Sequence, residues 1–260
     1  MLTTHKRLQP SPESHFITRH LDTDSPMVFF DIETTGFHRD YSKLVSISLI
    51  EMSEDNLHYH YFFNESGREE AEILTAAQGL LSSKYLISFN GDAFDVPYLM
   101  HKYAKHGIDT PLTTARNIDL MKVAKASLHL DNYKLKSIET ALGIHRSDTL
   151  SGLDCIDAYK QHLETGDPVH AEKIALHNEE DTLNLIQLMY RLLEHHSGVL
   201  ELYKPHYFEW RDAEINLISL KIEGDFATLI FEPDPNIEET HWLEDFQVNP
   251  PERFSITGRP

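Results

Sequence analysis

A continuous apolar segment that ends in two carboxylates constrains this fold more than any other feature of the sequence. Residues 27–32 read Met-Val-Phe-Phe-Asp-Ile, and Glu33 follows directly before Thr34-Thr35-Gly36. A run of this length bounded by turn residues is typical of a buried strand. Because alternate residues of a strand share a face, Asp31 and Glu33 are expected to point the same way, roughly 6–7 Å apart. The alternative is a frayed strand end with two incidental acids.

The buried interpretation has a chemical consequence. Two like charges at the end of a buried strand are costly unless a cation holds them. Hard divalent ions such as Mg²⁺ take carboxylate oxygens as ligands. The apolar residues before the pair and the Thr-Thr-Gly turn after it favour burial, so Asp31 and Glu33 are predicted to be metal ligands.

The order of the predicted elements indicates an α/β domain. These elements are strands over 27–32, 43–52 and 57–64, a helix over 69–82, a strand over 85–89, and mainly helical sequence from 95 to about 198. Asp167-Pro168 is a good helix start, with Asp as N-cap and Pro in the first turn, and Gly198 is a good stop. We expect one domain over residues 27–196.

The segments on either side of this domain look different. Residues 1–26 contain three prolines and no clear period, which predicts an arm. Residues 197–260 are expected to form an extension with one β-hairpin, in which Gly224-Asp225 supplies a two-residue turn. That register pairs Ile222 with Ala227, Leu220 with Leu229 and Ile218 with Phe231. After Pro233 the chain becomes acidic, which predicts a loosely held tail.

Composition limits the classes of protein to which this chain can belong. Of its 260 residues, 40% are hydrophobic and 25% are charged, the balance of a globular protein rather than a disordered one. No apolar run approaches the roughly 18 residues of a membrane helix, and the N-terminus lacks the apolar core of a secretory signal. The lone Cys155 excludes an intrachain disulfide, so a cytoplasmic location is expected.

The charge of the chain is unevenly distributed. A net charge of −19 argues against binding to nucleic acid through the overall charge. Residues 101–146, however, carry eight basic and four acidic residues, a net charge of +4, against −23 for the rest. This segment includes Lys134 and Lys136 and could face a polyanion. A solvated helical face that happens to contain lysines is the alternative.

A second polar group lies just after the strand predicted over 85–89. Asn90-Gly91-Asp92 is typical of a tight turn, and Pro97 suits the first turn of a helix that begins near Asp95. Asp92 and Asp95 are therefore candidate functional acids at a strand-to-helix turn. The alternative is that one of them is only an N-cap.

A third polar group interrupts the apolar stripe of the last long helix. The stripe follows steps of three and four residues and comprises Ile174, His177, Asp181, Leu185, Leu188 and Leu192. His177 and Asp181 therefore point where the core should be. A satisfied core histidine, or an exposed His–Asp pair one turn apart, are the alternatives.

Together these three motifs resemble the DEDD superfamily of 3′-to-5′ exonucleases, which have a ribonuclease-H-like fold. The first motif reads Asp-Ile-Glu-Thr-Thr-Gly. The second, Asn-Gly-Asp-Ala-Phe-Asp-Val-Pro-Tyr, resembles the proofreading domains of family B DNA polymerases and assigns the catalytic role to Asp95 instead of Asp92. Residues 132–138 resemble the same domains. Overall the chain looks most like the bacterial ribonuclease-H-like exonucleases called YprB-like, over about residues 27–196. The resemblance implies an α/β fold with a central mixed sheet flanked by helices.

The third motif combines features of two subgroups of that superfamily. Three residues separate His177 from Asp181, the gap of the subgroup that carries Tyr at the first position. The subgroup that carries His uses a gap of four. The role of His177, as a base or as a group that only positions water, therefore stays open.

The resemblance implies hydrolysis of phosphodiester bonds in single-stranded nucleic acid to nucleoside monophosphates with two Mg²⁺ or Mn²⁺ ions. Asp31, Glu33 and Asp181 would hold the ion that activates water. Asp31, with Asp95 mostly through water, would hold the second ion. His177 would orient or deprotonate the attacking water. The predicted substrate contacts are Thr34, Phe37, Asn90, Lys134 and Lys136, with Phe37 stacking on a sugar or base.

Two other functions fit the same residues. The departure at His177 favours a non-catalytic ribonuclease-H-like module that binds nucleic acid or protein. A phosphodiesterase of short oligonucleotides is favoured if the hairpin and the arm close the groove. The sequence leaves open whether DNA or RNA is the substrate and identifies no protein partner. His58 and His60 are expected to be solvated, and Cys155, with no base identified nearby, is expected to be structural.

Overall fold

The computed structural model describes residues 1–21, 26–54, 56–83, 85–113 and 116–200. In the C-terminal part it describes the segments 205–210, 213–223, 226–231, 241–243, 246–249 and 254–258. The chain divides into two compact units, Met1–Tyr203 and Lys204–Pro260, and each is considered by itself.

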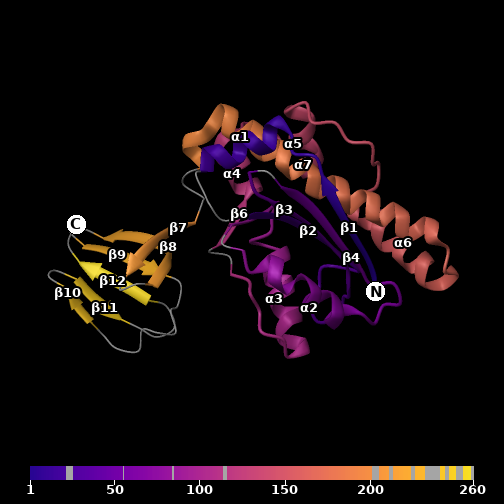
Figure 1. Cartoon of the computed structure of the whole chain (residues 1–260), viewed down its shortest axis with the longest axis horizontal. Helices are drawn as coiled ribbons and strands as arrows, with labels where there is room; N and C mark the ends of the chain where they lie inside the picture. Colours follow the sequence, from indigo (N-terminus) through magenta and orange to yellow (C-terminus); the bar gives the residue numbers. More distant parts are fainter. Residues whose placement is uncertain are drawn as a thin grey trace. The chain divides into compact units, whose positions relative to one another are not determined.

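A six-stranded mixed sheet in the order β1-β4-β3-β2-β5-β6 forms the centre of the first unit (Figure 1). Its strands are β1 (Leu2–Leu8), β2 (Met27–Thr34), β3 (Leu44–Met52), β4 (Leu57–Phe63), β5 (Tyr85–Ser88) and β6 (Asn117–Asp119). β2 pairs antiparallel with β3 and parallel with β5, and β5 pairs parallel with β6. β2 is therefore an interior strand, which explains why its sequence is apolar on both faces.

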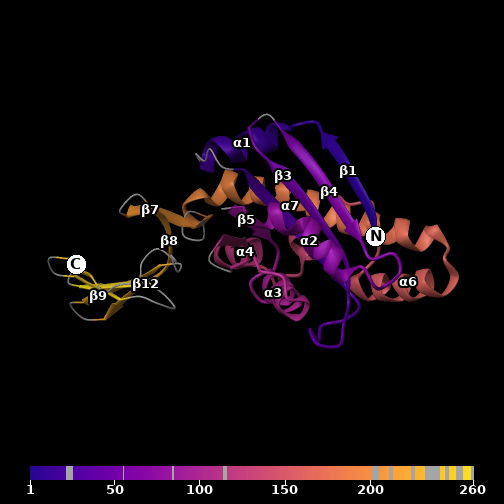
Figure 2. The ribbon, with the colours of Figure 1, turned by 60° about the horizontal axis from the view of Figure 1, so that its bottom comes forward.

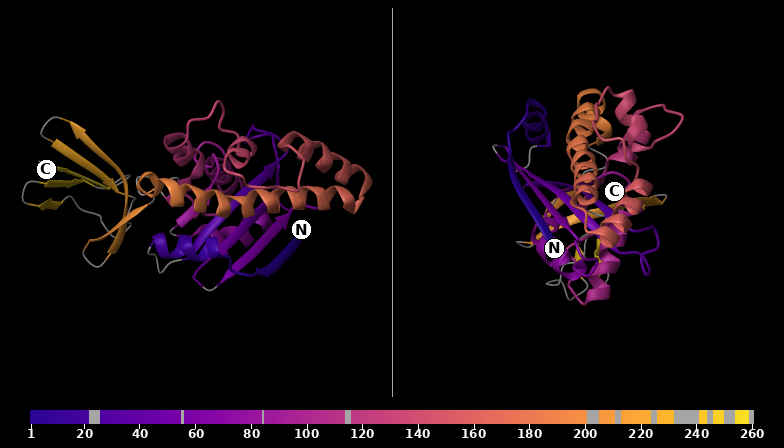
Figure 3. Two further views of the ribbon diagram at one scale, coloured as in Figure 1. Left: turned by 90° about the horizontal axis from the view of Figure 1, so that it is seen from above. Right: turned by 90° about the vertical axis from the view of Figure 1, so that its right-hand side faces the viewer.

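Helices cover both faces of this sheet (Figure 2). They are α1 (Pro12–Leu21), α2 (Glu70–Leu81), α3 (Asp95–His106), α4 (Leu120–Ser127), α5 (Leu135–Ala141), α6 (Gly152–Thr165) and α7 (Pro168–Leu200). One apolar core joins α2 and α3 to the sheet, and a second core joins α1, α4, α5, α6 and α7 to the opposite face. The long α7 lies across the strands (Figure 3) and contacts β2, β3, β4 and β5.

The two-residue period of β2 decides which face receives the carboxylates. Val28 and Phe30 belong to the core with α2 and α3, whereas Met27 and Phe29 belong to the core with α7. The same alternation places Asp31 and Glu33 on the α7 face. The alternation of β2 thus explains why Asp31 and Glu33 lie on the same face of the sheet, as predicted.

The fold class expected from the sequence is confirmed, and the strands of β2 to β5 lie where they were predicted. α7 begins as predicted, since the Asp167 carboxylate accepts a hydrogen bond from the Val169 amide at 3.0 Å. It ends at Leu200, beyond the predicted stop at Gly198. The short β6 was not predicted, because three residues carry too little periodicity to be recognised.

The segment 1–26, predicted as an arm without a clear period, forms a strand and a helix over most of its length. Leu2–Leu8 pairs antiparallel with β4 along its whole length, and Pro12–Leu21 is a helix whose Phe16 ring packs edge-on against Tyr190 of α7. β1 is an edge strand with exposed polar residues, so it lacks the alternation of a half-buried strand. Residues 22–25 lie outside the described part of the chain.

The second unit holds a six-stranded antiparallel sheet in the order β10-β11-β12-β9-β8-β7. Its strands are β7 (His206–Trp210), β8 (Ala213–Glu223), β9 (Phe226–Phe231), β10 (His241–Leu243), β11 (Phe246–Asn249) and β12 (Phe254–Gly258). The extension is therefore larger than one hairpin, and the expected loose tail contains three strands. The predicted turn at Gly224-Asp225 lies outside the described residues.

The predicted hairpin register holds near the turn and changes further away. Ile222 pairs with Ala227 and Leu220 with Leu229, as predicted. Phe231, however, pairs with Leu217 and not with Ile218, because the register shifts between Leu217 and Ser219. An irregularity of this kind places an extra residue in one strand, which a strict alternation does not anticipate. Among the described residues, no helix is both long and apolar enough to cross a membrane.

Candidate metal centre

Three carboxylates from two elements meet on the α7 face of the sheet. Asp31 and Glu33 come from β2, and Asp181 comes from α7. One carboxylate oxygen of each lies within 4.8 Å of the others. These are oxygen donors of the kind that a hard divalent cation takes. The structure thus brings together three of the four acids that the sequence analysis predicted as metal ligands.

Burial makes this cluster electrostatically costly without a cation. Burial, together with the charges of Asp181, Asp95 and Glu33, raises the pKa of Asp31 well above its usual range. Burial also raises the pKa of Glu33, although its hydrogen bond with His177 opposes the shift. Like charges in a low-dielectric setting favour protonation or a bound cation.

Asp95 lies beside this cluster at the start of α3. It is 4% exposed, and burial raises its pKa to about 7, with the charges of Asp119 and Glu33 adding to the shift. Hydrogen bonds from the backbone of Ile32 and of Asp95 itself oppose it. Asp92 is engaged elsewhere, because its carboxylate accepts hydrogen bonds from Lys122 and, at 2.7 Å, from Asn117. Asp95, and not Asp92, therefore lies within the electrostatic reach of the clustered carboxylates.

His177 connects the cluster to a fourth acid, Asp148. Its Nδ1 lies 2.6 Å from Oδ2 of Asp148, and its Nε2 lies 3.3 Å from Oε1 of Glu33 and 3.6 Å from Oδ2 of Asp181. Burial lowers the pKa of His177, but hydrogen bonds with Cys155 and Glu33 and the charge of Asp181 outweigh burial and raise it to about 12. His177 is thus an imidazolium held between carboxylates.

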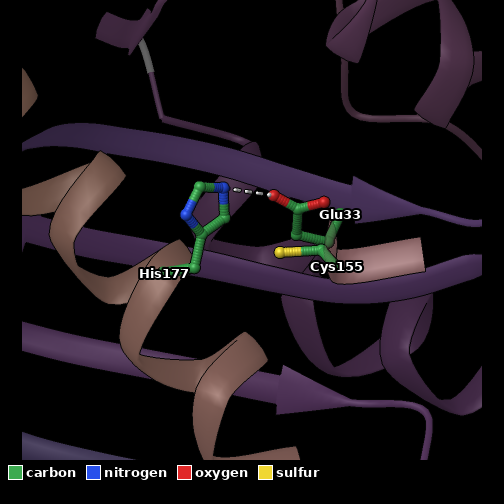
Figure 4. A group of neighbouring side chains, drawn as sticks. All are labelled: Glu33, Cys155 and His177. Atoms are coloured by element: carbon green, nitrogen blue, oxygen red, sulfur yellow. Dashed lines mark ion pairs between the residues drawn. The ribbon is translucent and has the colours of Figure 1, made fainter. Parts of the chain in front are cut away.

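Cys155 belongs to this neighbourhood, contrary to the expectation that no base accompanies it. The thiol is buried in α6, and Figure 4 shows it beside His177 and Glu33. Ligand atoms of these three residues lie within 4.8 Å of one another. Burial raises the pKa of the Cys155 thiol to about 11, although the hydrogen bond with His177 opposes the shift.

Arg146 supplies a second cation to the cluster. Its guanidinium donates to Oδ1 of Asp181, and it also pairs with Asp148 at 3.3 Å and with Glu139 at 3.0 Å. Glu139 is held in turn by the amide of Asn184 at 2.9 Å. This chain of contacts fixes the loop between α5 and α6 against α7.

Asn178 fixes the orientation of Asp31. Its side-chain amide donates to Oδ2 of Asp31 at 2.5 Å, and its carbonyl accepts a hydrogen bond from the Ser46 hydroxyl at 2.8 Å. Both Asn178 and Ser46 are fully buried. The rotamer of Asp31 is therefore held by a hydrogen-bond relay from β3 through α7.

A pocket of about 480 Å³ opens beside Glu33. Thr34, Phe37 and Lys134, three of the predicted substrate contacts, line it together with Phe94 and the start of α6. Phe37 is 79% exposed, and its ring meets Phe94 edge-on at 5.8 Å. The Thr34 hydroxyl donates to the Gly36 carbonyl at 3.0 Å, which shapes the turn at the rim.

The other two predicted substrate contacts do not line this pocket. Asn90 adopts a φ of 61°, and its backbone N–H donates to the Asp119 carboxylate at 2.8 Å, so it forms the turn before α3. Lys136 donates to the Leu150 carbonyl and lies 3.9 Å from Asp148. Their contacts with substrate stay predictions.

Sequence reasoning missed three residues that shape the cluster, namely Arg146, Asp148 and Asn178. Arg146 and Asp148 come from a loop without periodicity, so no pattern linked them to His177. Asn178 is fully buried, and the sequence signal for it was its spacing, four residues after Ile174 and three before Asp181.

Comparison with known families agrees with this arrangement. The family model described as "RNase_H superfamily" matches residues 28–193. The chain belongs to the RNase_H superfamily. The match spans β2 to α7 and so includes every carboxylate of the cluster. A comparison with curated proteins gives no match.

Solved structures share the fold of this RNase_H superfamily member at low sequence identity. The family B DNA polymerase of the hyperthermophilic archaeon Pyrobaculum calidifontis is 12% identical, with a TM-score of 0.51 over 80% of this chain and 34% of that chain. Exonuclease I is 13% identical, with a TM-score of 0.51 over 80% of this chain and 55% of that chain. Brucella melitensis NrnC with bound Mg²⁺ is 18% identical, with a TM-score of 0.46 over 69% of this chain and 81% of that chain.

The extent of these matches limits what they describe. The chain spans about a third of the polymerase and about half of exonuclease I. At these identities the likeness concerns the fold. The resemblance to DEDD-type exonucleases noted in the sequence is confirmed at that level.

Proposed function

We propose that this member of the RNase_H superfamily is a metal-dependent 3′-to-5′ exonuclease that hydrolyses single-stranded DNA or RNA to nucleoside monophosphates. The observation that carries the proposal is the meeting of Asp31, Glu33 and Asp181, with oxygens within 4.8 Å of one another. The fold shared with exonuclease I and with a family B polymerase supports this class of reaction.

The residues present fit hard divalent cations. The three clustered carboxylates offer only oxygen donors, and burial raises the pKa of both Asp31 and Glu33, as expected of a site whose charge a cation would balance. Asp31, Glu33 and Asp181 would hold one ion, and Asp31 with Asp95 the other. Bound Mg²⁺ or Mn²⁺ would supply a Lewis acid for the phosphate and lower the pKa of water.

His177 is the proton-handling group of this proposal. Because the Asp148 carboxylate accepts a hydrogen bond from Nδ1–H, Nε2 is left facing Glu33 and Asp181, where the attacking water would sit. The charges that keep His177 protonated belong to those same carboxylates. When they are neutralised, the imidazole can release its Nε2 proton and accept one from water.

The pocket beside Glu33 supports the choice of a single-stranded 3′ end as substrate. Its exposed aromatic side chain, Phe37, offers a stacking surface that tolerates any base. Lys134 adds a positive charge from the basic segment 101–146 at the same pocket. An unpaired terminal nucleotide is small and exposed enough to enter such a site.

An ion pair favours a second candidate function, the non-catalytic binding module. Arg146 occupies one oxygen of Asp181 and already balances part of the negative charge. A cluster neutralised by arginine has less need for a metal ion. Turnover decides between the two functions.

The test is cleavage of single strands labelled at either end, as matched DNA and RNA, with Mn²⁺ or with chelator. We expect a 3′ label to be released at once as a mononucleotide and a 5′-labelled strand to shorten stepwise, both only with Mn²⁺. Internal cuts or release from the 5′ end would contradict the proposed direction. Absence of cleavage on both DNA and RNA would favour the binding module.

A further inference from the structure

Glu33 and His177 also belong to a second group of ligating side chains, whose third member, Cys155, has no part in the nuclease proposal. This group, the Cys155 cluster, comprises Glu33, Cys155 and His177, whose ligand atoms lie within 4.8 Å of one another. All three are buried. Figure 4 shows the His177 Nε2 facing the Glu33 carboxylate and the Cys155 sulfur pointing toward the imidazole. The three side chains thus converge from β2, α6 and α7.

The chemistry of these donors differs from that of the carboxylate cluster. One sulfur, one imidazole nitrogen and one carboxylate oxygen form a donor set for a borderline-soft ion, and Mg²⁺ does not favour sulfur or nitrogen. The 3.3 Å between Nε2 of His177 and Oε1 of Glu33 matches the roughly 3.3 Å expected between two such ligands on tetrahedral zinc. We propose that the Cys155 cluster is a Zn²⁺ site.

Asp148 gives this assignment independent support. A histidine that ligates a metal through one ring nitrogen usually donates its other N–H to a carboxylate. Oδ2 of Asp148 lies 2.6 Å from Nδ1 of His177, and the Asp148 carboxylate is itself held by Arg146 at 3.3 Å and by the Leu150 amide at 2.9 Å. His177 is therefore already oriented as a metal ligand, with Nε2 directed into the cluster.

A pocket adjoins this site on the Glu33 side. Glu33 lines the pocket of about 480 Å³, and so do Gly152 and Ile156, which lie on the same helix as Cys155. The pocket is thus lined by β2, which carries Glu33, and by α6, which carries Cys155. The fourth coordination position would be open to a water or a phosphate oxygen from this pocket.

Zinc at the Cys155 cluster is incompatible with the nuclease arrangement. Binding releases the thiol proton of Cys155 and the Nε2 proton of His177 to solvent, and it withdraws His177 and Glu33 from the water and the hard ion. Zn²⁺ is therefore an inhibitor of hydrolysis. This consequence rests on the proposed function, whereas the site itself does not.

Cobalt substitution tests the site without any activity measurement. Because Cys155 is the only cysteine of the chain, a thiolate-to-Co²⁺ charge-transfer band can arise from no other residue. Titration of the metal-free protein with Co²⁺ should give this band, saturating at one equivalent, and Zn²⁺ should bleach it. Absence of the band in the wild-type protein would overturn the proposal.

Variants locate the ion. Cys155→Ser and Cys155→Ala should abolish the band, whereas the matched variant Asp31→Asn should keep it, because Asp31 ligates only in the carboxylate cluster. Loss of the band in Asp31→Asn would overturn the assignment. Asp148→Asn, which removes the carboxylate behind His177, should weaken Zn²⁺ affinity about 10–100-fold. Unchanged Zn²⁺ affinity in that variant would contradict the role given to His177.

The inhibitory effect is measured as a ratio within each protein. Turnover in saturating Mn²⁺ should fall when micromolar Zn²⁺ is added to the wild type. Cys155→Ser should need at least about tenfold more Zn²⁺ for the same fractional inhibition. Equal sensitivity in both proteins would place the inhibiting ion among the carboxylates and overturn the inhibition. A cobalt band in a protein that never cleaves nucleic acid would leave the zinc site standing and refute the nuclease.

Discussion

Oδ2 of Asp148 lies 2.6 Å from Nδ1 of His177, and the two side chains are 2% and 4% exposed. Burial opposes ionisation of Asp148, but hydrogen bonds from His177 and from the Leu150 amide outweigh it and lower the pKa of Asp148. A buried carboxylate that stays ionised against a histidine fixes the tautomer and the ring orientation of that histidine. Asp148 therefore determines which nitrogen of His177 faces the carboxylate cluster.

Replacing Asp148 with Asn is expected to slow Mn²⁺-dependent mononucleotide release. The amide keeps the shape but loses the charge that stabilises the protonated ring, so part of the roughly 10²–10⁴-fold contribution of a positioned acid–base group is lost. Asp157→Asn, on the exposed face of α6, is the matched control and should behave like the wild type. Equal turnover in Asp148→Asn and the control would show that His177 needs no orienting carboxylate.

Substitutions of His177 separate positioning from proton transfer. Tyrosine can also hydrogen-bond a water from this helical turn, so His177→Tyr should keep much of the activity, whereas His177→Ala should lose roughly 10²–10⁴-fold. If the imidazole is a base, the wild-type rate should rise with pH through a group that the Tyr variant lacks. The measurement is turnover of all three proteins over about pH 6–9 at saturating Mn²⁺. Near-wild-type activity of the Ala variant would remove His177 from the mechanism.

The parts of this site that the sequence could predict are those carried by periodicity. Two-residue alternation placed Asp31 and Glu33 on one face of β2, and the helical stripe placed His177 and Asp181 on the buried side of α7. Arg146 and Asp148 follow from tertiary packing of an irregular loop, which no local pattern encodes. The edge strand β1 was not predicted either, because its largely exposed residues show no apolar alternation.

Asp95 makes the stability of the metal-free protein depend on pH. The pKa of Asp95 is raised to about 7 in the folded chain, above the ordinary aspartate pKa of about 3.9 in an unfolded chain. Between these values unfolding releases a proton, so the free energy of unfolding falls as pH rises through this window and then levels off. Asp95→Asn removes the ionisable group and with it this loss of stability at high pH.

Melting in chelator across pH 4.5 to 8 measures this effect. The melting temperature of Asp95→Asn minus that of the wild type should increase with pH, by on the order of 10 °C in total. Titrating groups remote from Asp95 contribute equally to both proteins and cancel in the difference, whereas the pKa values of Asp31, Glu33 and Asp119 change with the charge of Asp95. A difference that stays constant with pH would show that Asp95 keeps an ordinary pKa.

Lys134 is expected to attract the phosphate backbone at the pocket. Lys134→Glu should weaken binding of a single strand on the order of tenfold at low ionic strength and much less at high salt, because the interaction is electrostatic. Lys160→Glu is the control, since Lys160 is exposed on α6 and pairs with Asp157 at 3.0 Å. Fluorescence anisotropy with Ca²⁺ in place of Mn²⁺ measures binding. Equal affinities of the two variants for the strand at low salt would show that Lys134 is a solvated lysine that does not contact the strand.

The central claim is that the carboxylates of β2 and α7 hold the cations that hydrolyse a strand from its 3′ end. The most direct measurement is the rate of mononucleotide release in Mn²⁺ by the wild type and by Asp31→Asn, purified in parallel, with a chelator control. Asp31 is the acid shared by both proposed ions, so the account predicts release by the wild type and a loss of at least about 10²-fold in the variant. Equal rates in the two proteins, or release that persists in chelator, would contradict it.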